Sequence, residues 1–164
     1  MAEEKITPPS PGISRAIPPL VFALCFVGAL VLEWLFFQSV APLIFLPEWM
    51  RLILGILVCA AGTAIMAWGF FGFKLSGTSP NPAKPASHLV DTGAFAISRN
   101  PMYVGLVAIL LGFGVFIDSL PMLLAGLVMF VYLDRYVIRR EEAYLITAFG
   151  ESYRYYCHQV RRWL

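Results

Sequence analysis

Four long apolar runs, separated by polar segments, constrain this chain more than any other feature of its sequence. Two of them, residues 19–40 and 52–73, have the roughly 20 residues that a helix needs to cross a hydrocarbon layer. Two shorter runs, residues 101–117 and 120–137, are joined by a two-residue link. Apolar residues make up 59% of the chain and charged residues 13%, which excludes a disordered chain and an ordinary soluble domain. The sequence therefore predicts an integral membrane protein.

We expect an all-α fold, in which a four-helix transmembrane bundle is followed by cytoplasmic amphipathic helices. Residues 1–18 are polar and rich in proline, and we predict that they form a disordered cytoplasmic tail. Residues 19–164 are predicted to form a single domain. The first apolar run exceeds the ~7–15 residues of a signal-peptide core, so we expect it to be retained as a span.

The C-terminal part of the chain predicts helices beyond the membrane. A helical pattern continues past the fourth run to about residue 148, and Gly150 is placed to end that helix. Residues 151–163 show a second amphipathic pattern, with four large side chains expected on one face: Tyr153, Tyr156, Val160 and Trp163. Three arginines of this segment are expected to be available to lipid headgroups or an anionic ligand: Arg154, Arg161 and Arg162.

The uneven distribution of basic residues predicts the orientation in the membrane. With four spans, the N-terminal tail, residues 74–100 and the C-terminal segment lie on one side. Of the 12 Lys and Arg residues, 11 fall on that side or at its membrane edge, and Arg51 falls on the other. Because loops rich in Lys and Arg remain in the cytoplasm, we expect both termini to be cytoplasmic. The brevity of the chain favours a prokaryotic plasma membrane.

Glycines recur at a fixed spacing within two of the apolar runs. Gly55, Gly62 and Gly69 are seven residues apart in the second run, and Gly105 and Gly112 repeat this spacing in the third. Small residues on one stripe of a helix let two backbones approach closely in lipid. We therefore interpret these glycines as packing positions of a tight bundle.

Two polar segments are predicted to meet at the cytoplasmic end of the third and fourth runs. In the first segment, Asn100 is placed to cap the third helix, and Pro101 takes its first position. The free N–H groups of such a helix start are suited to a carboxylate. The second segment carries Glu141 and Glu142 just after the fourth run. Because the third and fourth runs form a hairpin, we expect the two segments to be neighbours at the same depth.

Residues 85–163 carry a specific pattern in two blocks, and its members are Leu89, Val90, Gly93, Phe95, Arg99, Asn100, Pro101, Tyr103, Gly105, Glu141, Glu142, Leu145, Phe149, Gly150 and Tyr153. This pattern resembles the isoprenylcysteine carboxyl methyltransferase family and its phospholipid methyltransferase relatives. The family pattern is H-x-L-V-x-x-G-x-Y, then R-H-P-x-Y-x-G, a hydrophobic stretch, and E-E followed by L, F-G and Y. The spacing within each block is intact.

The chain departs from the family pattern at several positions. Ser87 stands at the first histidine, with His88 displaced by one position, and Asn100 replaces the histidine before the proline. Asparagine donates hydrogen bonds but does not become charged, so we expect no proton transfer at this position. Val137 occupies the place where the family has an arginine one turn before the first glutamate. Two nearby arginines are the candidates for polarising a substrate: Arg139 and Arg140.

The resemblance implies a membrane-embedded methyltransferase that uses S-adenosylmethionine, with no metal. The implied acceptor is lipophilic and enters from the bilayer: a prenylcysteine-like carboxylate, a phospholipid amine, or a small apolar thiol or acid. An aromatic face suits the cofactor's sulfonium, a glutamate its ammonium, and the start of the third helix its carboxylate. Residues 85–105 and 138–164 would form the site, and the residues expected to bind the cofactor are Ser87, His88, Leu89, Val90, Phe95, Asn100, Pro101, Met102, Tyr103, Gly105, Glu141 and Glu142.

Other interpretations start from single features. Glu33 lies inside the first run, and an ionisable residue in a span is consistent with a small four-span transporter subunit. A partner such as Arg51 or a polar neighbour would satisfy this carboxylate. Glu141 and Glu142 are also consistent with a solvated exit helix, in which Arg139 pairs with Glu142. The net charge of +2 and the three cysteines indicate neither a nucleic-acid partner nor a disulfide framework.

Overall fold

The computed structural model describes residues 17–37, 46–77 and 89–164, and all structural statements below concern these ranges. The predicted N-terminal tail therefore lies outside them, except that the first helix begins at Ile17, inside that predicted tail. Ser87 and His88, two residues expected to bind the cofactor, also lie outside the described residues.

The described residues form helices and no strands, which confirms the all-α prediction. The α-helices are α1 (Ile17–Leu32), α2 (Glu48–Leu75), α3 (Pro101–Ile117), α4 (Leu120–Tyr132), α5 (Arg139–Phe149) and α6 (Glu151–Gln159). A π-helical turn, Glu33–Phe37, extends α1, and a second, Leu133–Ile138, joins α4 to α5 without a break. A 3-10 turn, Gly93–Ala96, precedes α3.

Three helices are long and apolar enough to cross a membrane: Ile17–Phe36, Glu48–Leu75 and the continuous helix Leu120–Phe149. The remaining apolar helix, Pro101–Ile117, has the bounds that the sequence predicted but only 17 residues. At ~1.5 Å per residue such a helix is slightly shorter than the hydrocarbon layer. The helix α2 is longer than the predicted run at both ends, and the added residues include Glu48 and Lys74.

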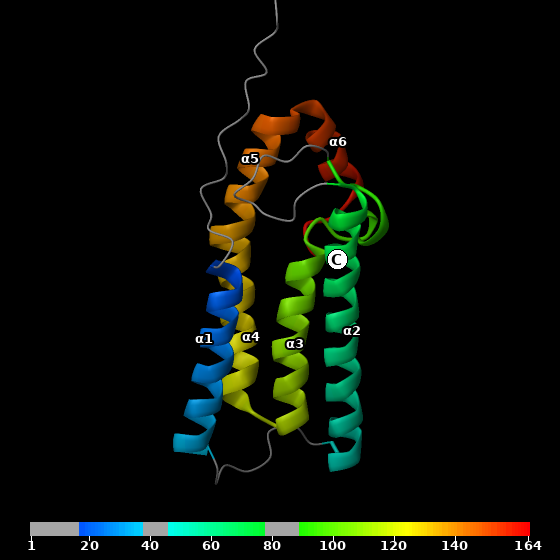
Figure 1. Ribbon diagram of the computed structural model, residues 1–164. Helices are drawn as coiled ribbons and strands as arrows, with labels where there is room; N and C mark the ends of the chain where they lie inside the picture. The colour runs from blue at the N-terminus through cyan, green and yellow to red at the C-terminus, as the bar shows by residue number, and fades with distance from the viewer. Residues whose placement is uncertain (1–16, 38–45, 78–88) are drawn as a thin grey trace, which may run out of the picture.

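Helices α3 and α4 lie at the centre, with α2 along α3 and α1 along α4 (Figure 1). A hydrophobic core joins α1, α3 and α4 through Ala29, Val107, Leu110, Met122, Met129, Leu133, Val137 and Ile138. At one end, α5 extends α4 beyond the other helices, and α6 turns back toward the start of α3 (Figure 1). The C-terminal segment is thereby brought over the helix start that the sequence singled out.

The glycine stripes lie where α2 meets α3, which confirms their prediction as packing positions. A Cβ atom added at Gly62 would lie 2.9 Å from the carbonyl oxygen of Gly105, and one added at Gly105 would lie 2.5 Å from that of Gly62. A Cβ atom at Gly112 would lie 2.8 Å from the backbone nitrogen of Cys59. Such distances leave no room for a side chain, so the two backbones depend on glycine for their close approach.

At the opposite end of the helices, two polar contacts connect neighbouring elements. The Ser119 hydroxyl donates to the Glu33 carboxylate at 2.5 Å, and Arg51 pairs with Asp118 at 2.8 Å. Glu33 is therefore satisfied by a polar neighbour and not by Arg51. The Ser119 oxygen also accepts from the Met122 N–H, which caps the start of α4. These contacts give Glu33 a structural role at the end of the molecule that is remote from the two predicted segments.

The C-terminal prediction is confirmed in part. The helix runs to Phe149 and ends at Gly150, whose φ of 54° suits glycine. The next helix ends at Gln159, not at residue 163, so the amphipathic pattern overextended it. Trp163 consequently does not share the buried face of Tyr153 and Tyr156, but packs on Phe130 of α4 with a ring-centroid distance of 4.6 Å.

Replacing Gly62 with alanine should lower the free energy of unfolding by about 1–3 kcal/mol, the usual cost of overpacking a tight interface. The matched control is Gly28→Ala on α1, where an added Cβ atom meets nothing within 4 Å. Thermal unfolding of both variants in one detergent measures the difference. Equal melting temperatures for the two variants would contradict the close α2–α3 contact.

Candidate functional site

The start of α3 has the predicted backbone but a different side-chain arrangement. Asn100 is the N-cap residue and Pro101 follows at the first helical position, as expected. The Asn100 side chain makes no capping hydrogen bond, however, and donates instead to the carbonyl oxygen of Arg162 at 3.0 Å. The prediction that this side chain caps α3 was therefore wrong, because the Asn100 amide group is turned toward the C-terminal segment.

The C-terminal segment is attached to the start of α3 by three donors. Besides Asn100, the Ser98 hydroxyl donates to the Arg162 carbonyl at 3.4 Å, and the Arg99 N–H donates to the Arg161 carbonyl at 2.9 Å. Ser98 is buried, and its oxygen also accepts from the Asn100 N–H. These bonds hold the non-helical residues that follow α6 against the loop, beginning with the extended Val160.

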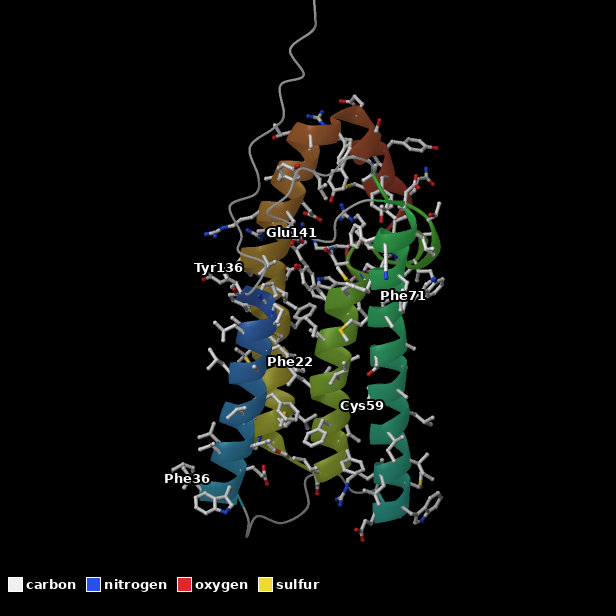
Figure 2. All side chains as sticks on the ribbon, viewed as in Figure 1. Phe22, Phe36, Cys59, Phe71, Tyr136 and Glu141 are labelled. Atoms are coloured by element: carbon white, nitrogen blue, oxygen red, sulfur yellow. The ribbon has the colours of Figure 1, made fainter. Side chains whose placement is uncertain are left out.

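The hairpin brings Tyr103 and Glu141 together. The Tyr103 hydroxyl donates to the Glu141 carboxylate at 2.8 Å, which joins the first turn of α3 to the first turn of α5. Glu141 lies on its helix at the level of the loop before α3, whereas Tyr136 lies on the outer side (Figure 2). The predicted proximity of the two polar segments is thus seen in the structure.

Glu142 has a different environment from Glu141. Arg162 binds it through two nitrogens, with Nη2 2.6 Å from one carboxylate oxygen and Nε 3.1 Å from the other. Arg99 adds a third contact at 3.3 Å. The alternative interpretation, in which Arg139 pairs with Glu142, is therefore wrong, because the partners of Glu142 come from the loop and the C-terminal segment. Arg139 and Arg140 are exposed on α5.

A third carboxylate, Asp134, completes the site. It lies in the π-helical turn that joins α4 to α5, and such turns often occur at functional sites. It accepts from Arg162 at 3.2 Å and from the Trp163 indole N–H at 3.0 Å. Arg162 therefore bridges two carboxylates and is not available to lipid headgroups, contrary to the sequence prediction. Its hydrogen bonds with Glu142 raise the pKa of Arg162 above its ordinary value.

A second cluster packs the loop before α3 against α6. Its buried members are Val90, Phe95, Tyr153, Tyr156 and Val160. The Tyr156 hydroxyl donates to the Phe95 carbonyl at 2.6 Å, and Phe95 stacks edge-on against Phe73 of α2. Burial raises the pKa of both Tyr153 and Tyr156 above the ordinary tyrosine value. This cluster fixes the loop that carries Leu89 and Val90.

The remaining predicted residues lie against α2. A Cβ atom added at Gly69 would lie 3.0 Å from the Met102 side chain and 3.1 Å from Pro101. Gly105 lies in the glycine contact described above. The structure therefore brings Asn100, Tyr103, Glu141 and Glu142 together, whereas Pro101, Met102 and Gly105 position the helix that carries Tyr103.

Sequence reasoning missed the roles of four residues: Arg99, Asp134, Arg162 and Trp163. Arg99 was part of the family pattern but was not selected, although its side chain also reaches Glu142 and Cys157. Asp134 is the only acidic residue within the fourth apolar run, and this signal was available. Nothing in the local sequence indicates that Arg162 and Trp163 fold back onto it.

The site is chemically suited to a cationic ligand. Among the ion pairs of the described ranges, none includes Glu141, although both Asp134 and Glu142 are paired with arginine. An ionised carboxylate that is partly buried without a cation is unfavourable, and a bound cation would stabilise it. No group of three His, Cys, Asp or Glu side chains within the described part of the chain is arranged to hold a metal ion.

Comparison with known proteins identifies the class. The sequence pattern of the family described as phospholipid methyltransferase matches residues 50–152, which is more than half of the chain. The chain also resembles an uncharacterized protein of Haemophilus influenzae, with 36% identity over 63 residues, 38% of this chain and 100% of that relative. No solved structure matches it significantly. The chain therefore belongs to the phospholipid methyltransferase family, and its enzymatic class is that of a methyltransferase.

Replacing Tyr156 with phenylalanine should lower the free energy of unfolding by about 1–2 kcal/mol at neutral pH, because the Phe95 carbonyl loses its buried donor. The difference in the free energy of unfolding between this variant and the wild type should become smaller above the ordinary tyrosine pKa of about 10. There the unfolded chain loses the Tyr156 proton while the folded chain retains it, so the wild type loses stability as the pH rises.

Thermal unfolding from pH 8 to 11 measures both effects, with Tyr155→Phe as the control. Tyr155 is 70% exposed on the same helix. A difference that stays constant with pH, or equal behaviour of the two variants, would contradict the buried position of Tyr156.

Proposed function

We propose that this chain is an integral membrane methyltransferase that binds S-adenosylmethionine between α3 and α5 and methylates a lipophilic acceptor. The acceptor class is a phospholipid amine, a prenylcysteine-like carboxylate, or a small apolar thiol or acid. Family membership supports the cofactor and the lipid character of the acceptor. The observation that carries the proposal is the Tyr103–Glu141 contact at 2.8 Å, which joins the two blocks of the family pattern.

The residues at this contact fit the cofactor's charged groups. S-adenosylmethionine supplies an electrophilic methyl group on a cationic sulfonium when it is bound. Glu141 has no cationic partner among the ion pairs of the described residues and is suited to the cofactor's ammonium. The Tyr103 ring would stabilise a nearby sulfonium by about 0.5–2 kcal/mol. The start of α3 offers a partial positive charge to the carboxylate.

The neighbouring elements would complete the site. Leu89 and Val90 would offer backbone groups to the adenine, and Phe95 packs the loop that carries them against α2 and α6. Methyl transfer is a direct displacement, so the protein acts mainly by alignment and by excluding water. The bonds from the C-terminal segment to Ser98, Arg99 and Asn100 support such a closed site.

We further propose four spans with both termini in the cytoplasm. Helices α2 and the continuous α4–α5 helix run in the same direction, so the chain must return between them, and α3 is the element that does so (Figure 1). The site then lies at the cytoplasmic face, where a lipophilic acceptor would reach it sideways from the bilayer. Residues 19–164 would form one domain around this site.

Purified protein in detergent should bind S-adenosylmethionine, and saturating cofactor at 100 times its Kd should stabilise the fold by about 2.7 kcal/mol. Tyr103→Ala should weaken binding about tenfold through loss of the aromatic face, and Tyr103→Phe less, since it keeps the ring. Calorimetry and thermal unfolding measure both effects, with the exposed Tyr155→Ala as control. Cofactor that produces neither heat nor a shift in melting temperature would contradict the proposal.

The proposed topology predicts which ends of α2 are accessible from outside the cell. In a variant without the three native cysteines, Glu48→Cys should react with a membrane-impermeant maleimide in intact cells. Ser76→Cys, at the other end of α2, should react only after the membrane is permeabilised. Both positions are exposed, so protection by the fold does not explain a difference. Equal labelling in intact cells would overturn the orientation.

A further inference from the structure

The two adjacent glutamates differ in their partners. Glu142 is bound by two arginines, through contacts of 2.6 and 3.1 Å from Arg162 and 3.3 Å from Arg99. Glu141 accepts a hydrogen bond from the uncharged Tyr103 hydroxyl, and no ion pair of the described residues includes Glu141. Two carboxylates that are neighbours in the sequence therefore have different charge environments.

Arg162 connects Glu142 to the rest of the C-terminal segment. Its guanidinium bridges Glu142 and Asp134, while its backbone carbonyl accepts from Ser98 and Asn100. The next residue, Trp163, donates to the same Asp134 oxygen and packs at a tilt against the Phe130 ring. A single residue thus joins the α4–α5 helix to the start of α3.

From these contacts we infer that Arg162 is a positioning residue, that Glu142 is its counter-ion, and that Glu141 alone takes the cofactor's ammonium. This inference rests on the proposed function, and it assigns a different role to each of the two glutamates. With its charge matched by Arg99 and Arg162, Glu142 holds the C-terminal segment over the site. Glu141 has no cationic partner among the ion pairs of the described residues, so a ligand ammonium beside Tyr103 gains most at this carboxylate.

A comparison of two ligands separates the roles of the glutamates. S-adenosylhomocysteine carries the ammonium, and an analogue in which a keto oxygen replaces the amino group does not. Glu141→Gln should weaken binding of S-adenosylhomocysteine about tenfold but change binding of the keto analogue less than twofold, since only the ammonium contact is lost. Calorimetry on the full chain in detergent measures both affinities.

Glu142→Gln and Arg162→Gln should each lower the affinity for both ligands by the same factor. Both residues act through the C-terminal segment and not through the ligand's ammonium. The double variant should lose no more than either single variant, as expected for two members of one ion pair. Arg162→Lys keeps the charge without the two-nitrogen contact and should lie between wild type and Arg162→Gln. Arg154→Gln, an exposed arginine on α6, is the control and should match the wild type.

Three outcomes would overturn the inference. The first is a ligand-selective loss in Glu142→Gln, which would place the ammonium at Glu142. The second is additive losses in the double variant. The third is tighter binding in Arg162→Gln, which would mean that Arg162 competes with the ligand. Failure of the wild type to bind S-adenosylhomocysteine at all would instead contradict the proposed function itself.

Discussion

The ion pair between Arg162 and Glu142 is the interaction on which the candidate site depends. It joins the last residues of the chain to the α4–α5 helix, and the backbone of the same segment accepts hydrogen bonds from the start of α3. Charged groups at the edge of a membrane are expensive to desolvate and therefore pair where they can. Here the resulting ion pairs and hydrogen bonds surround the contact between Tyr103 and Glu141. The apolar helices form the bundle, and the few charged residues determine how the end that carries Tyr103 and Glu141 is assembled.

The glycine contact between α2 and α3 also helps to assemble the candidate site. Because Gly62 and Gly105 let the backbones meet, α3 is held at a fixed depth against a helix long enough to cross the membrane. The first turn of α3 carries Tyr103 on the side away from this contact, toward α5. Packing between the apolar helices thus determines the position along the bundle at which Tyr103 meets Glu141.

Much of this arrangement could be predicted from the sequence because it depends on local or periodic signals. Pro101 marked the start of α3, Gly150 marked the end of α5, and the seven-residue spacing marked the glycines as packing positions. The proximity of Tyr103 and Glu141 followed from the hairpin alone. The path of residues 160–163 could not be predicted, because donors on Ser98 and Asn100, about sixty positions earlier, pull the segment out of its helical pattern. The partners of Arg162 depend on that path and were missed for the same reason.

The chain belongs to the phospholipid methyltransferase family, and the central proposal is that it transfers a methyl group to a lipid-soluble acceptor at the start of α3. The most direct measurement is transfer of labelled methyl groups from S-adenosylmethionine into a total lipid extract by the purified protein. We expect label in the organic phase with wild type and a strong reduction with Glu141→Gln. Label that does not exceed the level of a heat-inactivated sample, with cofactor and lipid both in excess, would contradict this claim.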